Sequence, residues 1–215
     1  MFQLSISAAC AYVRKALDEL ISVEEIGMLV SPDAVDIHKL VEGCIVEAAV
    51  RVHTDAPSYL LDGIAGTLDE DYSASLQDKV LTITMKKDCV RIASIKAGDS
   101  DYVVCDLIPE DSAEGRKQLN KYTCGTYDDP RVVLMKKWTG EYQPILKYYS
   151  LKKDAVNPGI TLEYIPYPVI DETIILISPR LEYNVLNEIV ALVLDSINES
   201  QKAQLYRAKA QNYGG

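Results

Sequence analysis

The chain has 215 residues, of which 48% are hydrophobic and 25% are charged. These proportions are typical of a protein with a buried core, so they exclude a mainly disordered chain, and the length suits one domain or two small ones. The net charge is −10, from 22 Lys and Arg against 32 Asp and Glu. An acidic surface repels phosphate, which argues against a free-standing nucleic-acid-binding protein. The same charge is compatible with a protein that surrounds DNA without binding it.

Cysteine usage and hydropathy exclude further classes. The five cysteines are odd in number and none lies close to another in sequence, so the chain predicts neither a disulfide framework nor a zinc knuckle. Reduced thiols in a cytoplasmic setting are expected. No run approaches the roughly 18 consecutive apolar residues that a membrane-spanning helix needs.

Two amphipathic helices are predicted near the start of the chain. In the first, SAACAYVRKALDELI, Ser7 suits the N-cap position and apolar residues recur at three- and four-residue spacing. In the second, Ser31 suits the N-cap, Pro32 takes the first helical position and Pro57 follows the end. The apolar stripe of this second helix consists of Ile37, Leu40, Val41, Cys44, Ile45, Ala48, Ala49 and Val52. The two helices are expected to pair.

From about Gly66 the pattern changes to short runs rich in β-branched residues, which predict strands. The seven runs are KVLTITM, CVRIASI, YVVCDL, RVVLMKKW, PILKYYS, ITLEYI and TIILIS. A short surface helix is expected within residues 109–122. Seven short strands separated by turn-rich segments favour an antiparallel sheet or a β-sandwich.

Helical spacing returns after Ser178-Pro179, which repeats the Ser-Pro start of the second helix. The apolar stripe here is Leu181, Val185, Leu186, Ile189, Val190, Val193 and Ile197. Asn198-Glu199-Ser200 predicts a break, followed by a more polar last helix. We therefore predict an α+β fold, in which residues 1–66 and 176–215 form a helical bundle from both chain ends and residues 67–175 are inserted as a β-rich module.

A search for catalytic or metal-binding residues predicts none. His38 and Glu42 lie one helical turn apart, but no further ligands accompany them, so an exposed pair on a helix surface is favoured over a metal site. His53 falls at a helix end, where a protonated imidazole is expected on electrostatic grounds, and no nucleophile motif accompanies it. The acidic run Asp69-Glu70-Asp71 lacks the ligand spacing of an EF-hand and is interpreted as a solvated loop. We expect no cofactor; a small hydrolase using His38 or His53 is the enzymatic alternative.

The aromatic residues supply the candidate interface. The chain has 14 tyrosines against one Phe and one Trp, and amphipathic rings of this kind are enriched at protein interfaces. Strand propensity explains tyrosines in a sheet equally well. A basic group in the same region could meet an acidic partner or DNA, although sheet edges also carry Lys. The candidate interface residues are Tyr148, Tyr149, Tyr164, Tyr167, Lys136 and Lys137.

The order of the predicted elements resembles that of a known protein family. Two N-terminal helices beginning near VRKALDEL, a β-module, a strand ending in Ser-Pro and closing helices are similar to the head-to-tail connector and tail-tubular ring proteins of tailed bacteriophages. The segments CGTYDDPRVVLMKKWTGEYQPILKYYSLKKD and ITLEYIPYPVIDETIILISPRLEYNVLNEIVALVLDSINESQKAQLYRAKAQNY carry the resemblance. Within this group the chain is similar to ring proteins of the crAss-like short-tailed phages.

This resemblance implies a structural protein of the virion, assembled in the host cytoplasm, and no enzyme. Such a protein forms a ring, commonly of twelve copies, that encloses the DNA channel and bridges the portal to the tail. Its partners are other copies of itself, the portal and adjacent tail or ring proteins, while DNA passes without sequence-specific binding and no membrane is involved. The alternative is a cytoplasmic interaction module that recognises a peptide or partner through the Tyr-rich sheet.

Overall fold

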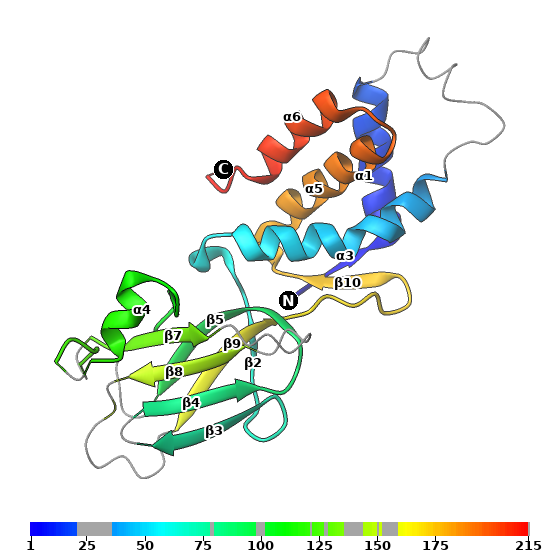
Figure 1. The fold of residues 1–215 in the computed structure, drawn as a ribbon. Coiled ribbons are helices and arrows are strands. Elements are labelled where there is room, and N and C mark those ends of the chain that lie inside the picture. The colour runs from blue at the N-terminus through cyan, green and yellow to red at the C-terminus, as the bar shows by residue number, and fades with distance from the viewer. Residues whose placement is uncertain are drawn as a thin grey trace. The chain divides into compact units, whose positions relative to one another are not determined.

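The computed structural model describes residues 1–20, 36–77, 80–97, 102–120, 122–126, 129–135, 144–149, 151 and 159–214. The chain has an α+β fold and divides into two compact units (Figure 1). We call Met1–Asp62 with Pro168–Gly215 the helical unit, and Gly63–Tyr167 the β unit. These boundaries differ from the predicted 66/67 and 175/176. The second one lies earlier because the last strand, Ile174–Ile177, belongs to the helical unit.

The helical unit is made by both chain ends. Its elements are β1 (Phe2–Ser5), α1 (Ile6–Leu20), α3 (Ile37–Asp55), the short 3₁₀ helix η1 (Ser58–Leu60), β10 (Ile174–Ile177), the 3₁₀ helix η2 (Pro179–Leu181), α5 (Glu182–Ser196) and α6 (Ser200–Ala210). Helices α1, α3 and α5 contact one another, and α6 packs on α5. Val13, Ile45 and Ile189, one from each of α1, α3 and α5, are fully buried. The predicted apolar stripes thus supply the core of this unit.

The segment TIILIS was counted among the seven strands of the β-region, with the predicted boundary at 175/176 inside it, whereas β10 lies wholly in the helical unit. It pairs antiparallel with β1, from Phe2 opposite Ile177 to Ser5 opposite Ile174. Leu4, Ile175 and Ile177 are buried, so one face of this two-stranded sheet adds to the core of the helical unit. The sequence gives little sign of β1, because four residues are too few to establish an alternating pattern.

The helix starts differ from the predicted ones. Helix α1 begins at Ile6, and the Ser5 hydroxyl, rather than that of Ser7, accepts a hydrogen bond from the Ala8 N–H at 3.1 Å. Helix α3 begins at Ile37 and has Asp36 as its N-cap, whose carboxylate accepts from a first-turn N–H at 3.1 Å. The predicted cap Ser31 and the adjacent Pro32 lie outside the described residues. The helix ends before Pro57, as predicted.

Ser178 does not cap a helix by its side chain, although it precedes the 3₁₀ helix η2 that leads into α5. Its hydroxyl instead accepts a hydrogen bond from the Asp62 N–H at 3.2 Å, because it is buried against the segment that follows α3. The predicted break between the last two helices is confirmed. Helix α5 ends at Ser196, α6 begins at Ser200, and Asn198 between them has a φ of 63°, which Asn tolerates better than most residues.

In the part of the β unit that the structure describes there are two sheets and one short helix. Its elements are β2 (Ile64–Ala65), β3 (Tyr72–Gln77), β4 (Val80–Met85), β5 (Cys89–Ala97), β6 (Ile108–Pro109), α4 (Ala113–Gln118), β7 (Arg131–Met135), β8 (Ile145–Tyr149) and β9 (Ile160–Pro166). The strand orders are β3-β4-β8-β7-β6 and β2-β9-β5. All pairs are antiparallel except β6 with β7. Side chains from both sheets form one hydrophobic core, as in a sandwich.

Two details of the β unit were predicted with different success. The surface helix expected within residues 109–122 is confirmed as α4, and the Ser112 hydroxyl caps it by accepting from the Gly115 N–H at 2.9 Å. The predicted strand YVVCDL is wrong, because only Val104 forms a bridge, to Ile95 of β5. β-Branched residues raise strand propensity, but pairing with a neighbour decides whether a strand forms.

Candidate functional site

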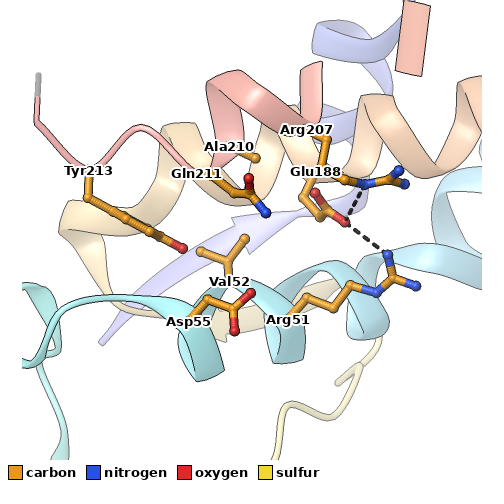
Figure 2. Close-up of a pocket in the computed structure, with 8 residues that line it drawn as sticks. All are labelled: Arg51, Val52, Asp55, Glu188, Arg207, Ala210, Gln211 and Tyr213. Carbon is orange, nitrogen blue, oxygen red and sulfur yellow. Dashed lines mark hydrogen bonds and ion pairs between the residues drawn. The ribbon is translucent and has the colours of Figure 1, made fainter. Parts of the chain in front are cut away.

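The helical unit contains a pocket between α3, α5, α6 and the C-terminal tail (Figure 2). Its volume is about 110 Å³. The lining residues are Arg51, Val52, Asp55, Glu188, Arg207, Ala210, Gln211 and Tyr213. Six of these eight side chains are polar or charged, so the pocket suits a polar ligand better than an apolar one.

Glu188 of α5 lies at the inner end of this pocket, with only 6% of its side chain exposed. Its Oε1 accepts a hydrogen bond from Arg51 Nη1 at 3.1 Å and lies 3.8 Å from Arg207 Nε. A buried carboxylate needs such partners, because desolvation of an unpaired charge is expensive. Glu188 thereby joins one guanidinium from α3 and one from α6.

Each of the two arginines also pairs with a carboxylate outside the pocket. Arg51 Nη2 lies 2.6 Å from Glu47 Oε1, and Arg207 Nη2 lies 2.6 Å from Asp195 Oδ2. Burial alone would lower the pKa of Arg51, but its hydrogen bonds to Glu188 and Glu47 raise that pKa above its ordinary value. The positive charge of each guanidinium is thus already compensated by carboxylates close to it.

The outer part of the pocket has a negative potential. Burial raises the pKa of Tyr213, and the negative charges of Asp55 and Glu188 raise it further. Figure 2 shows the Tyr213 hydroxyl and the Asp55 carboxylate on the same side of the pocket. A group with hydrogen-bond donors and positive charge would therefore be favoured at this place.

His53 was predicted to be protonated at a helix end, and the structure corrects this. The ring lies at the end of α3 but is 1% exposed. Its Nδ1 lies 2.7 Å from the Ala49 carbonyl oxygen and donates to it, while Nε2 accepts from the Ser178 N–H at 3.0 Å. Burial lowers the pKa of His53. A neutral imidazole with both nitrogens engaged joins α3 to the start of η2 and has no free position for acid–base chemistry.

His38 lies near its predicted partner on the surface of α3. Its Nδ1 is 3.9 Å from Glu42 Oε2, and about half of each side chain is exposed. Within the described ranges, no three His, Cys, Asp or Glu side chains come together as a metal site would require.

The candidate interface tyrosines lie mostly inside the β unit. Tyr148, Tyr149 and Tyr164 are buried, and only Tyr167, at 41% exposed, is open to a partner. Tyr148 and Tyr164 belong to the hydrophobic core of the β unit, and the adjacent Tyr149 is buried on the opposite face of β8, so these three rings are not exposed to a partner within this unit. Lys136 and Lys137 lie outside the described residues.

The acidic run before β3 is not a fully solvated loop. Asp71 is 5% exposed, its Oδ1 lies 2.5 Å from Lys87 Nζ, and its Oδ2 accepts from the Thr67 N–H at 2.7 Å. The hydrogen bond from Lys87 lowers the pKa of Asp71 most, and the Thr67 amide adds to it. Asp71 therefore holds the turn that leads into β3, whereas its neighbours Asp69 and Glu70 are exposed as predicted.

Sequence reasoning did not single out the pocket residues. Arg51 and Glu188 are 137 positions apart, and nothing local joins them. One signal was present, because Glu188 is the only charged residue between Tyr183 and Leu194 and interrupts a strongly apolar helix face. Such a residue is expected to have a buried partner.

Comparison with known proteins gives no relative, since neither a protein-family model nor a curated protein sequence matches the chain. Among the helices that the structure describes, none combines the length and the apolar character needed to cross a membrane.

Proposed function

We propose that the protein is a structural virion protein that forms a ring in the head-to-tail connector or tail of a bacteriophage. The ring would enclose the DNA channel and bridge the portal to the tail. Its partners would be other copies of the chain, twelve in the usual arrangement, together with the portal and adjacent ring proteins. No enzymatic role is proposed.

The observation that carries the proposal is the chain path through the two units. The helical unit uses both ends of the chain, and the β unit occupies Gly63–Tyr167 as an insertion. This is the element order in which the sequence resembles connector proteins. In a ring, the helical unit would pack against neighbouring copies of the chain, and loops of the inserted β unit would contact an adjacent ring.

Exposed apolar side chains on the helical unit support self-association. Tyr183 of α5 and Leu205 of α6 are more than half exposed, and Tyr59 of η1 is exposed as well. Exposed large apolar residues are a feature of surfaces that meet another protein chain. In a cyclic assembly, these residues of one copy would contact a different surface of the next copy.

The charge of −10 suits the wall of a DNA channel better than a DNA-binding site. Like charges keep a polyanion from adhering to the wall during passage, because binding affinity for DNA depends on cationic contacts with phosphate.

Electron microscopy of the purified protein, alone and mixed with its portal, tests the proposal. Rings are expected in at least one of the two samples, because assembly can require the portal as a template. Leu205→Asp should prevent ring formation while leaving thermal stability unchanged, and Gln204→Asp, on the neighbouring exposed position, should assemble normally. A strictly monomeric protein that binds neither portal nor tail proteins would overturn the proposal.

The two alternatives have fewer supporting residues in the structure than in the sequence. Of the two histidines that a hydrolase could use, His53 has both nitrogens in structural hydrogen bonds, which leaves the exposed His38. The peptide-recognition module relied on exposed tyrosines, and three of its four candidate rings are buried.

A further inference from the structure

The residues that line the pocket of the helical unit carry two guanidiniums and two carboxylates, and each guanidinium also pairs with a carboxylate outside the pocket. Two guanidiniums and four carboxylates leave a local charge of −2. The groups are Arg51 and Arg207, and Glu47, Asp55, Glu188 and Asp195. A positive ligand is therefore attracted to this place and a negative one is repelled.

Two carboxylate groups in the pocket are available to a ligand. Both polar contacts of Glu188 with described residues are made through Oε1, so Oε2 faces the pocket without a partner there (Figure 2). The Glu188 side chain is more than nine-tenths buried, and its Oε2 is not among the buried atoms that lack a partner, so this oxygen is accessible from the pocket. The Asp55 carboxylate lines the outer part and forms no ion pair with another described residue.

We propose that this pocket binds the cationic end group of an alkyl chain, a guanidinium or an ammonium. Such a group has only hydrogen-bond donors and matches Glu188 Oε2, Asp55 and the Tyr213 hydroxyl. The pocket volume of about 110 Å³ is large enough for several water molecules, so a small polar end group can replace them. Val52 and Ala210 supply an apolar wall for the alkyl stem.

One group in the pocket favours the opposite ligand. Arg207 Nε is buried and has no hydrogen-bond acceptor among the described residues, although Glu188 Oε1 lies 3.8 Å away. An anion could bind to this N–H. The local charge of −2 outweighs a single donor, because the charge of Arg207 is already compensated by Asp195.

The cationic group could come from the Lys or Arg side chain of another protein chain or from a free small cation such as a polyamine. The chemistry of recognition is the same in both cases. Cation binding at this pocket does not require ring formation, so the two proposals are tested independently.

An NMR titration of the full chain with agmatine, which carries both a guanidinium and an ammonium, tests the site. We expect saturable shifts of the Nε–H signals of Arg51 and Arg207 and of the backbone amides near Asp55 and Tyr213. n-Butyrate at equal ionic strength is the anionic control and should leave these signals in place. Asp55→Asn should weaken agmatine binding about fivefold, the effect of one exposed charge pair. Glu42→Gln removes an exposed charge from the same helix and should have no effect.

Sedimentation with and without agmatine distinguishes the sources. If agmatine lowers self-association, the occupant is a side chain of a neighbouring copy. If agmatine binds without changing association, the occupant is a free cation or another protein, and the site is still supported. Shifts with butyrate instead of agmatine, or equal agmatine affinity in the wild type and Asp55→Asn, would overturn the proposal.

Discussion

Glu188 shows how one side chain can organise three helices. It projects from an apolar stretch of α5 into a buried position, where Arg51 donates a hydrogen bond at 3.1 Å. Arg51 also reaches the exposed Glu47 on its own helix. The two carboxylates contact the same guanidinium, but only one of them is buried, so their contributions to stability should differ.

The comparison of Glu188→Gln with Glu47→Gln measures this difference. Glu188→Gln keeps the shape of the side chain but loses a charge-assisted hydrogen bond, which is expected to lower the free energy of unfolding by about 1.5 to 3 kcal/mol. Glu47→Gln removes an exposed ion pair and should lower it by less than about 1 kcal/mol. Urea unfolding followed by circular dichroism measures both values. Equal effects would contradict a special role for the buried pair.

His53 should make the stability of the helical unit depend on pH. Its pKa in the folded state is lowered from 6.5 by burial, whereas the unfolded chain keeps the ordinary value. Above pH 6.5 the ring is neutral in both states and stability is unaffected. As the pH falls below 6.5, the unfolded state takes up a proton that the folded state resists, so stability falls by at most about 1.4 kcal/mol per pH unit. Unfolding measured from pH 7.5 to 5 should show this loss, and His53→Gln should show less of it.

At the scale of elements, the direction of each side chain decides its effect on packing. Helix α5 was predicted to bury one stripe that includes both Leu186 and Ile189. In the structure Ile189 is fully buried and Leu186 is only half-buried. The stripe is therefore displaced toward Asn187 and Glu188, whose buried polar groups have partners on neighbouring elements.

Aspartate substitutions on α5 test this displacement. Ile189→Asp places an unpaired charge in the core and should lower the free energy of unfolding by about 3 kcal/mol or more. Leu186→Asp can turn its carboxylate toward solvent and should be tolerated markedly better. Thermal denaturation of the two variants gives the comparison. A larger loss for Leu186→Asp would show that the assigned face of α5 is wrong.

The elements that sequence predicted best are those whose signals are local. The break at Asn198 and the end of α3 before Pro57 depend on a few adjacent residues, and both were predicted. The pairing of Phe2 with Ile177 joins the two ends of the chain, so no local pattern contains it. The tyrosines of β8 show the same limit, because strand propensity does not say which face of a strand is covered.

At the scale of the whole molecule, each unit has its own core. The core of the β unit consists of residues from Tyr72 to Tyr164, all of which lie within Gly63–Tyr167. The candidate pocket, in contrast, uses α3 together with α5 and α6. It could not be predicted from sequence, because its parts come from opposite ends of the chain and only the isolated charge of Glu188 hinted at a buried partner.

A fragment spanning Gly63–Tyr167 should therefore fold without the helices. It is expected to keep the near-ultraviolet circular dichroism of its buried tyrosines and to unfold cooperatively, because a chain of this length can sustain one core. Asp71→Ala should lower the stability of this fragment and of the full chain alike, since Asp71 contacts Thr67 and Lys87 within the β unit. A fragment with no fixed tertiary structure would contradict the independence of its core.

The pairing of β2 with β9 has a consequence for the order in which the chain folds. Ile64 lies opposite Tyr164, so the first and last strands of the insertion are neighbours once the β unit has formed. Joining α3 to α5 across an unfolded insertion of roughly a hundred residues would cost about 4 kcal/mol of loop-closure entropy. In a folded β unit, the pairing of β2 with β9 already holds the two ends of the insertion together, so this entropy is lost before the helices meet. We therefore expect α3 and α5 to pack together at a higher rate when the β unit is folded than they would if a flexible linker of the same length joined them.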